Sequence, residues 1–261
     1  MFELIVIVIL IAVVILLMRV FRSFMIRRSK INLGVIQILN DGALVETLNK
    51  DIMASSDLPF NGSVKASFFA SYLTLRESGF SANHYGLVSA YLFKWETEGI
   101  LQTEMTKDSL VYLTFIDEQK PTAEIELELY EILKSNGIED GGYIERTVLH
   151  DWSKKILALG EQELLETGDV AFDQKNRIRF TRQGYNKSLS HPSFEKYFEH
   201  LSSTTFNEMD DQRQLQELSF ALLLDLTEEI AEIIEPSSSE TPEILKIANR
   251  VWRIFKEEMR G

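Results

Sequence analysis

Four closely spaced cations are the side chains of this chain best suited to contact a phosphate. They are Lys175, Arg177, Arg179 and Arg182, and they lie on or beside two predicted short strands at residues 170–172 and 177–180. Cations at this spacing on a β-hairpin can neutralise phosphates of a nucleic acid and position the protein on its backbone. These four residues are therefore our candidates for nucleic-acid contact.

The residue types that usually carry catalysis or bind metals show no spacing typical of an active site. The histidines are His84, His150, His191 and His200, none of them in an HExxH arrangement, and the chain has no cysteine. It also lacks a P-loop, a GxGxxG motif and a GxSxG motif. Acidic runs such as residues 124–128 are typical of solvated helix faces. We therefore expect no catalytic residue, no metal and no cofactor, and predict that the protein is not an enzyme.

A second group of cations follows an uncharged apolar run, residues 4–18. These cations are Arg19, Arg22, Arg27, Arg28 and Lys30. A run rich in Ile and Val without a polar face suits lipid, and the cations after it can contact anionic headgroups. The positive-inside tendency then places the N-terminus outside and the remainder in the cytoplasm. We predict a single-pass protein of the cell membrane that contacts lipid through residues 1–30.

The charge of the remaining chain restricts its partners. The formal net charge of the 261 residues is −13, and residues 1–30 carry five Lys/Arg and one Glu, which leaves −17 for residues 31–261. Such a body repels nucleic acid except at a local basic patch, and favours a basic protein partner. Because 45% of the residues are hydrophobic, the chain can also bury a core of ordinary size.

Two tandem units of helices followed by a hairpin come after a connector at residues 31–62. The first unit, residues 63–120, is predicted to have helices at 63–77 and 81–98 and strands at 100–106 and 110–115. The second unit, residues 121–186, is predicted to have helices at 122–136 and 143–149, a helix capped by Ser153, and the two strands that bear the cations. Helices followed by a β-hairpin form the outline of a winged-helix unit.

The segments around these units are predicted to be mostly helical. Within the connector, residues 35–39 are expected to start a short helix that Asn40-Asp41-Gly42 ends. Residues 187–235 form a helical region, and residues 236–261 form a linker with a last amphipathic helix. The apolar face of that helix consists of Ile244, Ile247, Val251, Trp252 and Phe255. This face either docks on the body or binds a partner helix.

The predicted fold class is therefore mainly α with small β-hairpins. It comprises an N-terminal transmembrane helix with a basic juxtamembrane stretch, both within residues 1–30, two tandem winged-helix-like units and a helical C-terminal region.

Several motifs resemble the cytoplasmic part of a bacterial predicted membrane-protein family, domain of unknown function 2207. They are YGLVSAYL at residues 85–92, EGIL at 98–101, ELELYEIL at 126–133, FEKYF at 194–198 and SFALLLDLT at 219–227. The resemblance covers residues 80–235 and implies a shortened, single-span form of that family. It implies no activity, because the family supplies none.

These observations favour a membrane-tethered cytoplasmic protein-interaction module, a scaffold or adaptor without catalytic activity. The sequence does not identify the protein partner. The alternative is a membrane-anchored transcriptional regulator that binds DNA through the hairpin of the second unit.

Overall fold

The computed structural model describes residues 35–40, 43–48, 58–78, 83–105, 111–116, 118–140, 145–188, 206–227 and 242–255. Its helices are α2 (Val64–Ser78), α3 (His84–Thr97), α4 (Glu124–Ser135), α5 (Arg146–Glu166), α6 (Arg182–Lys187), α8 (Asp211–Leu224) and α10 (Glu243–Ile254). Short 3-10 turns are η2 (Pro59–Gly62), η3 (Ile138–Asp140) and η4 (Phe206–Glu208).

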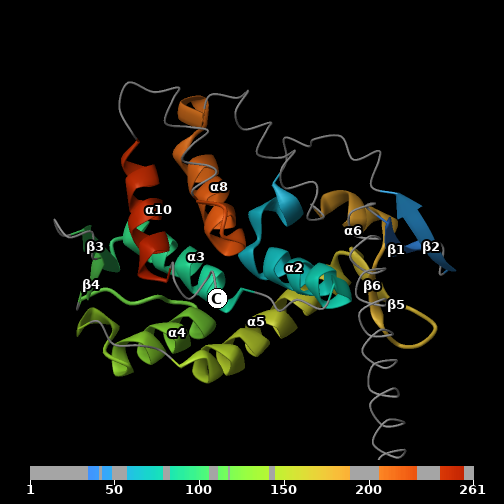
Figure 1. The fold of residues 1–261 in the computed structure, drawn as a ribbon, viewed down its shortest axis with the longest axis horizontal. Helices are drawn as coiled ribbons and strands as arrows, with labels where there is room; N and C mark the ends of the chain where they lie inside the picture. Colours follow the sequence, from blue (N-terminus) through green and yellow to red (C-terminus); the bar gives the residue numbers. More distant parts are fainter. Residues whose placement is uncertain are drawn as a thin grey trace, which may run out of the picture.

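The strands of the described residues form antiparallel hairpins. They pair β1 (Val35–Asn40) with β2 (Ala43–Leu48), β3 (Leu101–Met105) with β4 (Val111–Phe115), and β5 (Val170–Phe172) with β6 (Ile178–Phe180). The β3–β4 hairpin and the β5–β6 hairpin lie at opposite ends of the long axis, with the helices between them (Figure 1).

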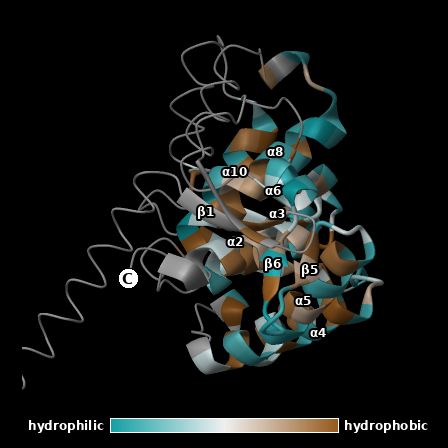
Figure 2. Ribbon diagram, turned by 90° about the vertical axis from the view of Figure 1, so that its right-hand side faces the viewer, coloured by the Kyte–Doolittle hydropathy of each residue, from teal (hydrophilic) through white to brown (hydrophobic). Residues whose placement is uncertain are grey.

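The predicted fold class needs correction in its membrane-spanning element. Within the ranges described above, no helix is both long and apolar enough to cross a bilayer. Residues 1–30, on which that prediction falls, lie outside the described residues. Helices α4, α5 and α8 instead alternate between hydrophobic and hydrophilic stretches (Figure 2), as helices with one buried face do. The structure is thus mainly helical with small hairpins. The predicted fold class, which included a transmembrane helix, is wrong.

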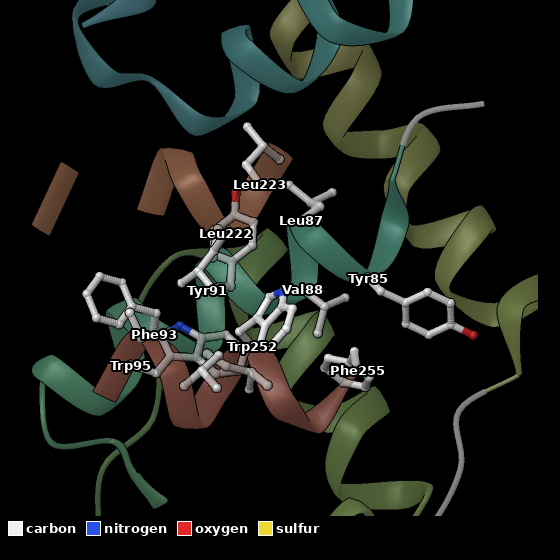
Figure 3. Close-up of a cluster of buried hydrophobic side chains, with 14 of the residues drawn as sticks. Tyr85, Leu87, Val88, Tyr91, Phe93, Trp95, Leu222, Leu223, Trp252 and Phe255 are labelled. Atoms are coloured by element: carbon white, nitrogen blue, oxygen red, sulfur yellow. The ribbon is translucent and has the colours of Figure 1, made fainter. Parts of the chain in front are cut away.

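Helix α3 lies at the centre of the main hydrophobic core. Its residues Leu87, Leu92 and Phe93 are fully buried, with α8 and α10 packed against the helix (Figure 3). A helix that is apolar on nearly all sides is stable only when other elements cover all of those sides. Gly86 allows α8 to come close, because a Cβ at this position would lie 2.7 Å from the carbonyl oxygen of Leu223.

Helix α10 uses its apolar face inside the chain. Val251, Trp252 and Phe255 are buried, and Ile244 and Ile247 are partly buried against the same core. Trp252 and Phe255 lie beside α3 in Figure 3. Of the two alternatives that the sequence leaves open, the structure therefore has α10 docked on the body, so this face is not presented to a partner helix.

Polar contacts at both sides of this apolar face hold α10 in place. The indole Nε1–H of Trp252 donates to the Asp225 carboxylate at 2.7 Å. The Arg250 guanidinium forms an ion pair with Glu96 at 3.0 Å and donates to the Thr103 hydroxyl, also at 3.0 Å. These contacts connect α10 to the end of α8, to α3 and to β3.

The segment predicted as two successive helices is the single helix α5. The prediction of a break before Ser153 is wrong, because no proline or other helix breaker separates the two parts. Ser153 is fully buried and donates its hydroxyl to the carbonyl oxygen of His150 in the same helix, at 2.9 Å. Serine satisfies its hydroxyl in this way inside helices, so it does not have to act as a cap.

Helix α2 packs along α5, across the boundary between the two predicted units. The two backbones meet at Gly160, where a Cβ would lie 2.9 Å from Cβ of Phe69 and closer still to the carbonyl oxygen of Lys65. The main core likewise contains residues of both units, such as Trp95 and Trp152. Each unit keeps its helix–hairpin order, but helices of both units contribute to the main core, and a second cluster joins α2 to α5 and to the β5–β6 hairpin.

A buried carboxylate connects α3 to α4. Glu126 accepts a hydrogen bond from Nε1 of Trp95 at 3.0 Å and forms an ion pair with Lys94 at 2.7 Å. Burial raises the pKa of the nearby Tyr91 hydroxyl, and the charges of Glu126 and Glu163 raise it further. Tyr91 therefore stays neutral at physiological pH.

Residues 35–40 form strand β1, where we predicted a short helix, and β1 pairs with β2 in a hairpin. The prediction is wrong because Asp41-Gly42 between two runs of β-branched residues is a hairpin signal. In β1, Ile38 and Leu39 are buried, and Leu39 forms a parallel bridge with Thr181 next to β6. This hairpin therefore supports the β5–β6 hairpin.

Candidate functional site

The turn of the β5–β6 hairpin is organised by Asp173. Its carboxylate accepts hydrogen bonds from the backbone N–H groups of Lys175 at 2.8 Å and Arg177 at 2.9 Å. The guanidinium of Arg177 forms an ion pair with the same carboxylate at 2.8 Å, and Nε of Arg179 lies 3.8 Å from it. An aspartate that accepts backbone bonds two and four residues ahead closes a tight turn. Asn176 adopts a left-handed φ of 56°, which asparagine tolerates well.

The structure thus divides the four predicted nucleic-acid contacts into two pairs. Arg177 and Arg179 converge on the buried Asp173 carboxylate, so their charges are partly neutralised within the hairpin. Lys175 is exposed at the turn, and Arg182 is exposed at the first residue of α6. The β5–β6 hairpin therefore does not present the four predicted cations equivalently to a phosphate backbone.

The base of this hairpin is tied to α6. The buried Asp169 carboxylate forms an ion pair with Lys187 at 2.9 Å and accepts a hydrogen bond from Gln183 at 3.0 Å. Gly184 allows α6 to lie directly against the backbone just before β5, because a Cβ there would be 2.7 Å from Cα of Asp169. With β1 beside β6, the hairpin is supported on several sides.

Asp173 has a pKa below its usual value. Burial acts in the opposite direction by favouring the protonated form. The hydrogen bonds from Arg177 and from the backbone N–H of Lys175, together with the charge of Arg177, outweigh burial and lower the pKa. The carboxylate is therefore ionised in the folded chain at neutral pH and holds the two arginines.

Replacing Asp173 with asparagine is expected to change how stability depends on pH. A carboxylate whose pKa is lowered by folding stabilises the fold above its unfolded pKa of about 3.9. That contribution disappears as the pH falls through the folded pKa. The difference in unfolding free energy between the wild type and Asp173→Asn should therefore shrink below about pH 4, as measured by urea unfolding across pH. The exposed Asp211 makes Asp211→Asn the matched control. A difference that stays constant with pH would contradict the prediction.

The β3–β4 hairpin presents a different kind of surface. Leu101, Leu113 and Phe115 are buried on its inner face. Strand alternation places Tyr112 and Ile116 on the outer face, where they are 50% and 38% exposed.

The outer face continues along both strands. Glu104 lies directly opposite Tyr112 in the strand register, and Gln102 lies opposite Thr114. At the end of β3, Met105 is 52% exposed. The outer face therefore carries Tyr112 and Ile116 with Thr114 between them and Glu104 opposite Tyr112, whereas strand alternation places Met105 on the side of Leu101 and Thr103.

No family model matches the chain, and no curated protein or solved structure matches it either. The resemblance to the bacterial membrane-protein family therefore stays a prediction from its motifs.

Sequence reasoning did not single out Tyr112, Ile116 or Met105. Both strands were predicted, and their alternation places Tyr112 and Leu113 on opposite faces. Which of these faces is buried depends on α10 and η3, which pack on the hairpin from later parts of the chain. The exposed face could be identified only from the tertiary structure.

Proposed function

We propose that this protein is a protein-interaction module, a scaffold or adaptor without catalytic activity, that binds its partner through the outer face of the β3–β4 hairpin. The observation that carries the proposal is the exposure of Tyr112 and Ile116 on one face of a hairpin whose other face is buried. Single exposed apolar residues need no explanation. An aromatic and an aliphatic residue on one supported face have the composition of an interface centre.

The charge around this face suggests the chemistry of the partner. Glu104 lies opposite Tyr112 in the register, and residues 31–261 carry a formal charge of −17. Electrostatic complementarity then favours a partner with an apolar residue for the hairpin and basic residues around it. Because the hairpin is already held in place by its neighbours, it loses little conformational entropy on binding, which favours affinity.

The membrane location is a separate part of the proposal and rests on residues 1–30 alone. Attachment to a membrane would raise the effective concentration of this module for partners on the same surface. The orientation, with the body in the cytoplasm, stays a prediction from the distribution of cations.

The alternative, a regulator that binds DNA through the β5–β6 hairpin, has less support in the geometry. DNA binding through this hairpin would need Arg177 and Arg179 at a phosphate backbone. Both side chains instead lie at the Asp173 carboxylate.

Crosslinking in intact membranes tests the proposal. The variant Tyr112→Ser with Ile116→Ser should lose the crosslinked partner, because an interface aromatic often contributes about 2 kcal/mol or more, about thirtyfold in affinity. Both side chains are exposed, so the thermal unfolding temperature should stay close to that of the wild type.

Phe172→Ser is the matched control, because Phe172 is 51% exposed on the other hairpin. This control should keep the partner. Failure to recover any reproducible partner with the wild type, or retention of the partner by the double variant, would refute the proposed role of the β3–β4 hairpin.

A further inference from the structure

The short connection between residues 1–30 and the body restricts which end of the body can face a membrane. Strand β1 begins at Val35, five residues after Lys30. Five residues span at most about 18 Å, even when they are fully extended. Strand β1 lies beside β6 and α6, and a bridge joins Leu39 to Thr181. If residues 1–30 attach to a membrane, the end of the body that bears β5, β6 and α6 is therefore held close to its surface.

This end of the body is positively charged, although the body as a whole is acidic. Residues 167–188, which include the hairpin and α6, carry five Lys/Arg and two Asp, a net charge of +3. Residues 100–116, around the β3–β4 hairpin, carry −1, and strands β1 and β2 add only Glu46. An anionic surface attracts the end with +3. Repulsion from the acidic remainder is screened beyond about 8 Å at physiological salt.

The tip of the β5–β6 hairpin presents an exposed aromatic ring and an exposed cation. Phe172, the last residue of β5, is 51% exposed. Strand alternation puts it on the same face as Val170, which is buried in the second cluster, so the apolar face of the hairpin continues beyond that cluster. Lys175 is exposed in the turn that follows. Segments that lie on anionic membranes combine apolar aromatic residues with Lys and Arg in this way.

The backbone at this tip is already ordered. The Asp173 carboxylate accepts hydrogen bonds from the backbone N–H groups of Lys175 and Arg177. The side chain of Lys175 takes no part in these bonds. Contact with a membrane would therefore lose little conformational entropy of the turn, and it leaves the pairing of Asp173 intact.

We propose that the tip of the β5–β6 hairpin contacts an anionic membrane surface through Phe172 and Lys175. This inference rests on the proposed attachment of residues 1–30 and goes beyond it, because it assigns an orientation to the body. The β3–β4 hairpin lies at the opposite end of the long axis (Figure 1). Contact of one hairpin with lipid therefore keeps the other away from the bilayer, where Tyr112 and Ile116 are accessible to a protein partner.

Site-specific fluorescence of the full-length chain in vesicles tests this contact. The chain has no cysteine, so Gln174→Cys takes a single environment-sensitive fluorophore at the exposed turn. The vesicles contain phosphatidylcholine, phosphatidylglycerol and a lipid with a quencher near its headgroup. We expect the label at position 174 to be quenched. A label attached through Thr114→Cys, at an exposed position on the β3–β4 hairpin, should stay unquenched.

Further substitutions in the Gln174→Cys chain identify the side chains responsible. Phe172→Ser should reduce the quenching at position 174 to the level at position 114, because the ring no longer enters the interface. Lys175→Gln should lower the additional quenching that phosphatidylglycerol causes over pure phosphatidylcholine. Tyr112→Ser, on the other hairpin, is the matched control and should leave the quenching unchanged. Circular dichroism of each variant checks that its helix content is unchanged.

Flotation of the vesicles separates failure of the attachment from failure of the contact. A chain that does not float with the vesicles would refute attachment by residues 1–30, and the inference with it. Equal quenching at positions 114 and 174 of a floating chain, or undiminished quenching in Phe172→Ser, would refute the hairpin contact alone. A response of the label at position 174 to duplex DNA, with no difference between the two lipid compositions, would assign the hairpin to nucleic acid and also overturn the proposal.

The proposed protein interface is tested independently of this contact. In the crosslinking experiment, Phe172→Ser should keep the partner, because residues 1–30 still attach the chain and the β3–β4 hairpin is unchanged. Loss of the lipid contact together with retention of the crosslinked partner therefore shows that the two hairpins act separately.

Discussion

Replacing Trp252 with alanine is expected to lower the free energy of unfolding by about 3–5 kcal/mol. The indole is buried against α3 (Figure 3), so its removal leaves a large cavity between α3 and α10. The change also removes the hydrogen bond from Nε1 to Asp225. Chemical unfolding followed by circular dichroism measures the effect.

Arg253→Ala is the matched control for this prediction. Arg253 lies next to Trp252 on the same helix, but its side chain is exposed. Its replacement should change the unfolding free energy by no more than about 0.5 kcal/mol. If Trp252→Ala lowered the free energy of unfolding by as little as Arg253→Ala does, α10 would not be docked in solution. Its apolar face would then be available to a partner helix after all.

The second large effect is expected at the crossing of α2 and α5. Gly160→Val should lower the free energy of unfolding by about 3 kcal/mol, at the upper end of what overpacking costs. A Cβ at this position meets the backbone of Lys65, which cannot rotate away as a side chain would. Helix propensity does not explain such a loss, because valine is a better helix former than glycine.

Ala158→Val provides the control on the same helix, at an exposed position. It should cost no more than about 0.7 kcal/mol, the usual range of helix propensity. Equal effects at the two positions would argue against the close approach of α2 and α5. A much larger effect at Gly160 would support the shared core of the two predicted units.

This shared core bears on the proposed function. Because the units pack on each other through α2 and α5, their hairpins are held at opposite ends of one body (Figure 1). The β3–β4 hairpin can then present Tyr112 and Ile116 on a rigid support. The same packing brings His84 to His150.

The amino-acid sequence by itself determined most of the local elements, with residues 35–40 and the unbroken length of α5 as exceptions. Helix α2 begins after Ser63, close to the predicted start at residue 63, and Oγ of Ser63 accepts from the backbone N–H of Ala66 as an N-cap does. The hairpins β3–β4 and β5–β6 also fall within the predicted strand ranges. These features depend on residues only a few positions apart, so the sequence pattern contains the information that they need. The charge of −17 and the lack of cysteine are likewise properties of the sequence alone.

Only the tertiary structure decided how these elements pack and which of their side chains are buried, paired or exposed. His84 and His150 have no common motif, and Tyr112 becomes an exposed residue only because other elements cover the opposite face of its hairpin. Arg177 and Arg179 look like free cations in sequence, until the fold buries Asp173 between them. For the two histidines and for Tyr112 the physical reason is the same. Burial and pairing are set by contacts between distant segments, and hydrophobic periodicity shows which face is apolar but not which partner covers it.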